Sequence, residues 1–355
     1  VRSEISAELL ERTRVRLFDD NGMLLRETIR TTLAVETEDG RPLLGRLGID
    51  ISALDGPFYM PSNGSWRHLV VFALRHAETL PAPALDDVLA LFERFSIALL
   101  GQPHYTRAIV GQVYAWLGIV EAERGAPLRS DQKPKLTAGF TWSQLYEFES
   151  DLRRIFVSCA NSDPELAKAY LRGVAEQSHP EEIIKSLMKN RGQLAMAAPK
   201  QLVDLTLRGL ISPEARGRRG GRHDRDETAS YIDSSFLPAS PAQGPFLELL
   251  LTSQEEGLRL IHALVDHVIL QRSGGKDPGF NGYRLVFEDG ERFFPWIESY
   301  ALPRPYSDPY SVACALMALE AWRHRRIEAG EDVAAVLNDV LGPPGSPAAY
   351  LQVAV

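Results

Sequence analysis

Apolar residues recur at spacings of three and four along most of the chain from Trp66 onward. This is the period of an amphipathic helix that turns one face to a core. The first segments with this pattern are 66–77, 85–101, 105–125 and 140–160. Gly101 and Gly125 stand where helices commonly end. The pattern therefore predicts a mainly α protein.

Helix starts are also marked in the sequence. Capping-box pairs are present at Ser162–Glu165, Ser178–Glu181 and Ser253–Glu256. Proline stands near a predicted first turn at positions 164, 180 and 199. Short connections make successive helices antiparallel neighbours. We therefore expect antiparallel helix pairs in a solenoid-like (HEAT/TPR-like) array, although the sequence has no strict repeat period.

Two regions depart from the helical period. After a short helix predicted from Ser3, strand-like runs flank Asn21-Gly22, and Asp39-Gly40 is a second turn pair. These features predict a small N-terminal β-element. Residues 283–296 alternate between apolar and polar positions around Asp289-Gly290, which predicts a β-hairpin.

These patterns divide the chain into four predicted parts. The parts are a mixed α/β element at 1–59, a first helical block at 60–212, a flexible Arg/Gly-rich connector at 213–227 and a second helical block at 228–355 with the inserted hairpin. The chain starts at Val1, and its final segment SPAAYLQVAV carries no helix cap. We therefore expect a piece of a longer polypeptide.

Composition limits the class of function. The chain has 355 residues, is 45% hydrophobic and carries a net charge of −8, which argues against general attraction to nucleic acid or anionic membrane. No run of 18 apolar residues and no signal peptide is present, so no membrane partner is expected. Cys159 and Cys314 lie in helical contexts and imply no disulfide framework. The expected location is cytoplasmic.

The stretch EARGRRGGRHDRDE, residues 214–227, is the most unusual in the chain. Its arginines Arg216, Arg218, Arg219 and Arg222 could contact phosphates. Over residues 214–227, five arginines stand against four carboxylates and leave a local charge of +1, and no aromatic residue is interleaved. A self-neutralising connector is the favoured interpretation, and a nucleic-acid contact is the alternative.

The search for chemistry gives one further alternative. No Walker A, G-x-G-x-x-G, H-E-x-x-H, C-x-x-C or G-x-S-x-G motif is present, so no cofactor and no catalytic residue is predicted. His262 and Asp266 lie one helical turn apart and could share a metal ion in a hydrolase, but His267 points about 100° away. A polar helix edge is favoured there. The five tryptophans lie in apolar segments and are expected in the core.

Three segments carry a resemblance to a known family. The segments are LDDVLALFERFSIALLG, SSFLPASPAQGPFLELLLTSQEEGLRLIHALVDHVI and YSVACALMALEAW. Over residues 66–355 the chain resembles the helical-repeat region of large bacterial STAND-like multidomain ATPases, many of which are associated with antiviral defence. The resemblance implies an array that recognises a trigger or carries subunit contacts, with nucleotide bound elsewhere in the longer protein. No catalytic residue is carried over.

The sequence thus predicts a non-catalytic recognition or scaffold segment of a larger bacterial protein. Its expected partner is a protein or another domain of the same longer chain. Two alternatives remain open: a nucleic-acid-binding module that uses residues 216–223, and a metal-dependent hydrolase near His262 and Asp266.

Overall fold

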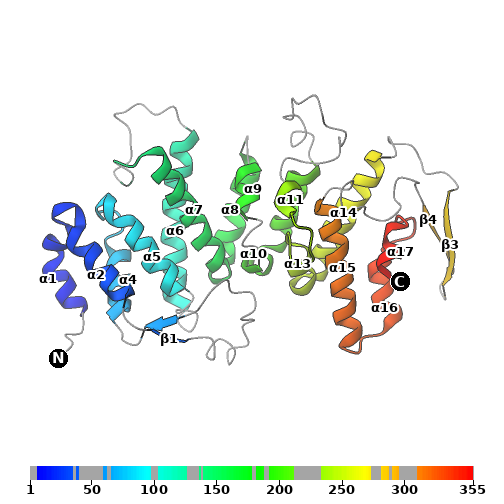
Figure 1. Cartoon of the computed structure of the whole chain (residues 1–355), viewed down its shortest axis with the longest axis horizontal. Helices are drawn as coiled ribbons and strands as arrows, with labels where there is room; N and C mark the ends of the chain where they lie inside the picture. Colours follow the sequence, from blue (N-terminus) through cyan, green and yellow to red (C-terminus); the bar gives the residue numbers. More distant parts are fainter. Residues whose placement is uncertain are drawn as a thin grey trace. The chain divides into compact units, whose positions relative to one another are not determined.

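A computed structural model gives the structure of the chain. The described residues are 6–34, 37–39, 59–61, 65–96, 103–125, 136, 139–177, 181–187, 192–211, 233–272, 281–287, 290–295 and 310–354. They are mainly helical, as predicted (Figure 1). The chain separates into two compact units, residues 1–166 and 167–355. The predicted parts 1–59, 60–212, 213–227 and 228–355 stay a prediction, because the connector lies outside the described residues.

The described part of the first unit is mainly helical. Its helices are α1 (Ala7–Phe18), α2 (Met23–Leu33), α4 (Ser65–Arg75), α5 (Leu85–Ser96), α6 (Pro103–Gly125) and α7 (Trp142–Cys159), and its described 3-10 turns include η1 (Asp20–Gly22) and η3 (Ala82–Ala84). Helix α2 packs on α1 and α5, and α7 packs on α5 and α6. The aromatic rings of Phe92, Trp116 and Phe148 follow one another in the core, with centroids 6.0 and 6.4 Å apart.

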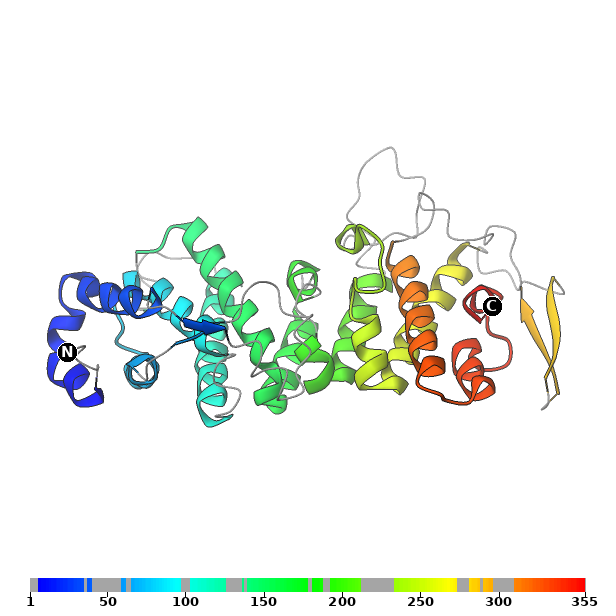
Figure 2. The same ribbon diagram turned by 60° about the horizontal axis from the view of Figure 1, so that its bottom comes forward.

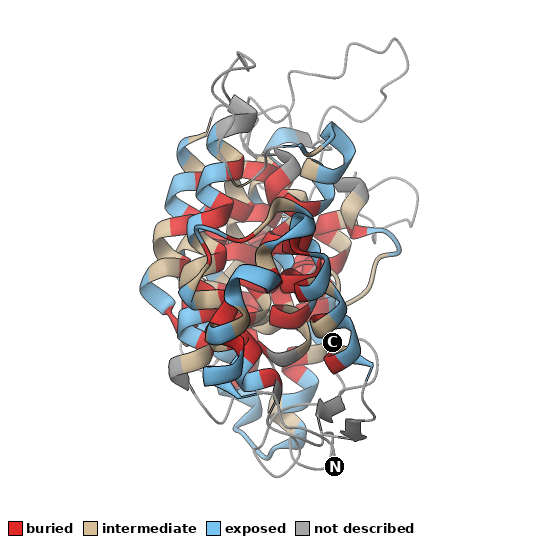
Figure 3. Ribbon diagram, turned by 90° about the vertical axis from the view of Figure 1, so that its left-hand side faces the viewer, coloured by how far each residue is buried: buried red, intermediate tan, exposed pale blue. Residues whose placement is uncertain are grey.

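Helix α8 (Pro164–Glu176) begins in the first unit and continues into the second. The other helices of the second unit are α9 (Glu181–Leu187), α10 (Gly192–Ala197), α11 (Pro199–Ile211), α13 (Phe246–Thr252), α14 (Gln254–Arg272), α15 (Tyr310–Glu328), α16 (Val333–Leu341) and α17 (Ala349–Ala354). Helix α14 approaches α13 closely at Gly257, where a Cβ atom would lie 2.7 Å from the Leu250 nitrogen. Most helices carry buried residues on one side and exposed residues on the other (Figure 3).

The described strands form two antiparallel pairs. Strand β3 (Gly282–Phe287) pairs with β4 (Gly290–Pro295), which confirms the predicted hairpin (Figure 2). Strand β1 (Thr37–Asp39) pairs with β2 (Tyr59–Pro61). This pair is a small N-terminal β-element, as predicted, whereas Gly40 of the predicted Asp39-Gly40 turn lies outside the described residues.

The predicted strands around Asn21-Gly22 are wrong. Both flanking runs are helical, and this part of the chain is α1, η1 and α2. Asn21 and Gly22 do have positive φ angles, 55° and 74°, but the turn joins two helices. Their apolar residues Leu10, Leu17, Leu25 and Ile29 follow the helical period and are buried.

Two smaller predictions also need correction. Trp142, expected in the core, is 66% exposed, because it is the first residue of α7 and lies on its outer side. Trp66, Trp116 and Trp322 are buried as predicted, and Trp296 lies outside the described residues. At the start of α8 the capping oxygen comes from Asp163, which accepts from the Leu166 amide, rather than from the predicted Ser162. No described helix is both long and apolar enough to cross a lipid bilayer.

Candidate recognition site

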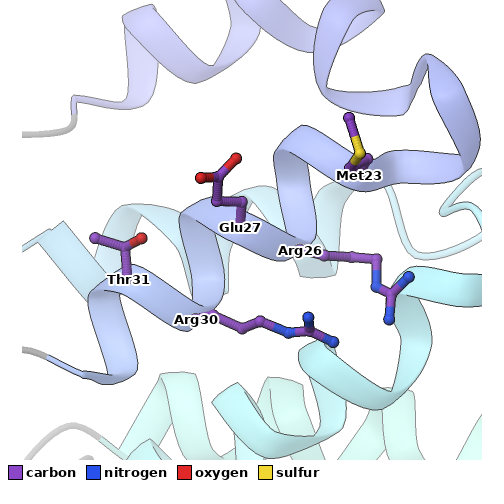
Figure 4. Close-up of a pocket in the computed structure, with 5 residues that line it drawn as sticks. All are labelled: Met23, Arg26, Glu27, Arg30 and Thr31. Carbon is purple, nitrogen blue, oxygen red and sulfur yellow. The ribbon is translucent and has the colours of Figure 1, made fainter.

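A shallow pocket of about 290 Å³ lies along the outer side of α2 (Figure 4). Its lining residues are Met23, Arg26, Glu27, Arg30 and Thr31. They are spaced by three and four positions, so they form one stripe of a helix. The side chains of Arg26 and Arg30 extend to one side of the stripe, and Met23, Glu27 and Thr31 form its other row. We call this surface the α2 furrow.

The opposite side of α2 is anchored in the core of the first unit. Leu25, Ile29 and Thr32 are buried there. The helix start is also fixed, because Gly22 packs against Pro81 so closely that a Cβ atom would lie 3.0 Å from the Pro81 Cγ. The furrow therefore rests on a rigid element rather than on a loop.

Asp87 of α5 holds both arginines of the furrow. Arg26 donates from its Nε to Asp87 Oδ2 at 2.9 Å, and Arg30 donates from its Nε to Asp87 Oδ1 at 2.7 Å. The Asp87 side chain is only 11% exposed, whereas that of Arg30 is 60% exposed. One buried carboxylate thus positions two guanidinium groups at the protein surface.

The charges around Asp87 influence one another. The hydrogen bond and the charge of Asp87 raise the pKa of Arg30 above its ordinary value. Burial, and then the negative charge of Asp87, raise the pKa of the neighbouring Asp86, while Arg26 acts in the opposite direction. Arg30 therefore stays charged beside Asp87.

Apolar surface adjoins these cations. Met23 is 60% exposed, and the neighbouring Leu24 is also exposed. A ligand with a carboxylate next to an apolar group could bind here. Its carboxylate would accept hydrogen bonds from the two guanidinium groups, and its apolar group would pack on the methionine. The furrow offers binding groups of this kind.

The residues weighed for a metal site have structural contacts instead. The Tyr350 hydroxyl donates to Asp266 Oδ1 at 3.2 Å, and the His262 ring lies edge-on to the Tyr350 ring, with centroids 4.9 Å apart. The Nε2 atom of His262 is buried and has no hydrogen-bond partner among the described residues. These contacts attach α14 to α17.

Burial shifts the titration of both groups. Burial lowers the pKa of His262, and a hydrogen bond with the Val340 backbone partly offsets this effect. Burial raises the pKa of Asp266, and the Tyr350 hydroxyl partly offsets it, although some of the Asp266 side chain remains in contact with solvent. Within the described part of the chain, no three His, Cys, Asp or Glu side chains lie close enough to hold a metal ion.

The remaining predicted contact residues are Arg216, Arg218, Arg219 and Arg222, which lie outside the described residues. Their proposed phosphate contact stays a prediction. Sequence reasoning missed the α2 furrow because it assigned residues 14–28 to strands, in which Met23 and Arg26 would lie on opposite faces. The helical spacing of Leu25, Ile29 and Thr32 was the signal that could have revealed it.

Comparison with known proteins gives no family for this chain. No protein-family model matches the sequence, and no curated protein matches it.

Proposed function

We propose that this chain is a non-catalytic recognition and scaffold segment that binds a protein partner through the α2 furrow. The observation that carries the proposal is the pair Arg26 and Arg30, held on Asp87 beside the exposed Met23. The partner segment is expected to place a carboxylate on the arginines and an apolar side chain on Met23.

The composition of the furrow supports a protein ligand. Arginine and methionine are enriched in protein–protein interfaces, and arginine is over-represented among the residues that dominate binding energy. An exposed arginine normally loses side-chain freedom when it binds, which costs about 0.5–1.5 kcal/mol for each immobilised side chain. Asp87 has already restricted both guanidinium groups, so this cost is reduced.

The wider architecture supports the same role. Helix pairs stacked in a solenoid-like array would extend the surface on either side of the furrow. The resemblance to the helical-repeat region of STAND-like ATPases also favours recognition of a trigger or of a neighbouring domain. We propose that the segment performs this role within a larger bacterial protein.

The test places a photo-crosslinking amino acid at Thr31, which is exposed in the furrow. Irradiation of cells that produce the protein should yield one dominant protein adduct. The double variant Arg26→Ala, Arg30→Ala should reduce that adduct by about tenfold or more, because two charged contacts are lost.

Arg14→Ala provides the matched control, since Arg14 is also an exposed helical arginine of the first unit but lies outside the furrow. It should leave the adduct unchanged. An adduct of equal yield in the double variant would refute the assignment of the furrow.

A further inference from the structure

Among the described residues, neither outer edge of the hairpin β3–β4 is paired with a further strand. Among the described residues, β4 is the strand that pairs with β3, and no described strand lies along the other edge of β3. Strand β4 is bound to the residues that precede α17, because the Ala348 amide donates to the Pro295 carbonyl at 3.0 Å. Among the described residues, the outer edge of β3 receives no such hydrogen bond, and it is the edge considered below.

The register determines which main-chain groups face that edge. Gly282 is paired with Pro295, which has no N–H to donate, so this pair fits the non-hydrogen-bonded type. The two pair types alternate along an antiparallel ladder. The N–H and C=O groups of Arg284 and Val286 consequently point away from β4, and those of Leu285 point toward it.

The side chains of β3 leave the edge accessible. Val286 is 84% exposed, and Leu285 is also exposed. Arg284 does not cover the edge, because its guanidinium reaches across the hairpin to Glu291 at 2.9 Å and lies over the Phe293 ring. An edge whose main-chain groups have no partner among the described residues, and which carries apolar side chains, is a template for another strand.

We propose that the outer edge of β3 binds an extended segment of a partner protein, which adds to the hairpin as a third strand. The outward main-chain groups of Arg284 and Val286 require a ligand with extended main chain rather than a helix. Leu285 and Val286 project from opposite faces of the hairpin, so the partner strand should carry apolar residues on both faces near its centre. A two-stranded hairpin is only marginally stable, and a third strand would stabilise it.

The extent of the edge favours a peptide segment over a second copy of the chain. Strand β3 has six residues, whereas a stable interface between folded proteins uses roughly 20–30 residues on each side. Peptides bound by strand addition need only a short edge, because main-chain hydrogen bonds supply their affinity. This site is separate from the α2 furrow and does not depend on the function proposed for it.

The experiment selects binders from a phage-displayed library of random linear peptides against the full chain. Enriched peptides, resynthesised, should bind the chain and protect the Arg284 and Val286 amides from hydrogen exchange. Val286→Pro removes one outward N–H and leaves the ladder with β4 intact. Val286→Pro should weaken peptide binding by about tenfold or more. The peptide loses the hydrogen bond from the Val286 N–H, and its own carbonyl is left without that donor.

Val286→Thr is the matched control, because it keeps the outward N–H and the β-branched shape, and it should bind the peptides nearly as well as the original chain. Continued protection of the Leu285 amide shows that the hairpin of Val286→Pro is still folded. The proposal is overturned if no peptide is enriched, or if Val286→Pro binds the peptides as tightly as Val286→Thr. It is also overturned if the chain dimerises in sedimentation and Val286→Pro abolishes the dimer, since a second copy would then occupy the edge.

Discussion

Gly22 occupies a position where both the backbone angle and the available space exclude a larger side chain. Its φ is +74°, and a Cβ atom would lie 3.0 Å from Pro81 Cγ and 3.3 Å from Ala84 Cβ. Gly22→Ala should therefore lower the free energy of unfolding of the first unit by about 1–3 kcal/mol. Urea denaturation of the two proteins measures the difference.

Gly111 provides the opposite case within the same unit. It lies inside α6, and a Cβ atom there would meet no atom of the described residues within 4 Å. Gly111→Ala should raise the free energy of unfolding by about 0.5–1 kcal/mol, because alanine loses less backbone entropy in a helix. Equal effects of the two substitutions would contradict the geometry assigned to the turn before α2.

His262 should make the second unit sensitive to acid. Burial lowers its pKa from the ordinary value of 6.5, so below about pH 6.5 the unfolded chain binds a proton that the folded chain does not. The contribution of neutral His262 to the free energy of unfolding is therefore complete above that pH, and it is lost as the pH falls toward the lowered pKa. The slope is at most about 1.4 kcal/mol per pH unit for a single group.

The neighbouring Asp266 acts in the opposite direction. Its pKa is raised from 3.8, so between that value and the raised one the folded chain holds more protons and acid favours folding. His262→Asn removes the titrating ring but keeps an N–H donor for the Val340 carbonyl. Denaturation between about pH 7.5 and pH 5.5 should show a smaller slope in this variant. An unchanged slope would mean that another group controls the acid response.

At the scale of helices and strands, the sequence pattern is reliable where two signals coincide. Residues 66–125 combine a helical period with terminal glycines, and α4, α5 and α6 lie there. Residues 14–28 combine a helical period with an Asn-Gly pair. The pair indicates only positive φ angles, which serve a tight helix–helix connection as well as a hairpin. The helical spacing of Leu25, Ile29 and Thr32 favours the helix–helix connection, and Gly22 packs against Pro81 and Ala84, which are distant in sequence.

The candidate sites were predictable to different degrees. His262 and Asp266 do lie near each other, as their spacing of one helical turn predicts, but their common neighbour is Tyr350 of α17 rather than an ion. Asp87 is separated from Arg30 by 57 positions, so no local pattern could bring them together. The exposed Trp142 illustrates the same limit, because a periodic segment does not reveal which of its ends the core covers.

The Arg/Gly-rich connector supports one prediction at this scale. If residues 216–223 contact phosphates, the chain should bind labelled single- or double-stranded nucleic acid, and deletion of these residues should abolish binding. Affinity should also fall steeply with added salt, because each phosphate contact releases counterions. A fluorescence titration across a salt series measures both effects.

The companion variant replaces the four flanking acidic residues by the corresponding amides; these residues are Glu214, Asp224, Asp226 and Glu227. It removes the flanking negative charge and should strengthen a genuine phosphate contact. If the original chain and this variant both fail to bind at about 100 mM salt, the stretch acts as a connector.

At the scale of the whole molecule, the division between the two units falls inside α8, since Leu166 belongs to the first unit and Ala167 to the second. The start of α8 depends on Asp163. Its Oδ1 accepts from the Leu166 amide at 3.3 Å, and its Oδ2 accepts from Arg107 Nε at 2.9 Å. A fragment that begins at Ala167, the first residue of the second unit, would therefore lack the first turn of α8 and its cap.

This arrangement predicts how the second unit behaves when it is produced alone. Residues 160–355 should unfold cooperatively, because the unit has its own core around Phe236, Phe246 and Trp322. A fragment that starts at Ala167 should be less stable by about 1 kcal/mol or more, because it lacks the Asp163 cap and the proline that begins the helix. Urea denaturation of the two fragments measures the difference.

Asp163→Asn in the longer fragment isolates the cap from the charge. Asparagine caps helices about as well as aspartate, so stability should change by less than about 0.5 kcal/mol, whereas Asp163→Ala should cost about 1 kcal/mol. Arg107 is absent from this fragment, so the ion pair cannot account for either result. Equal stability of all four proteins would show that α8 is held by packing alone, and a longer fragment without a cooperative transition would show that the second unit needs the first in order to fold.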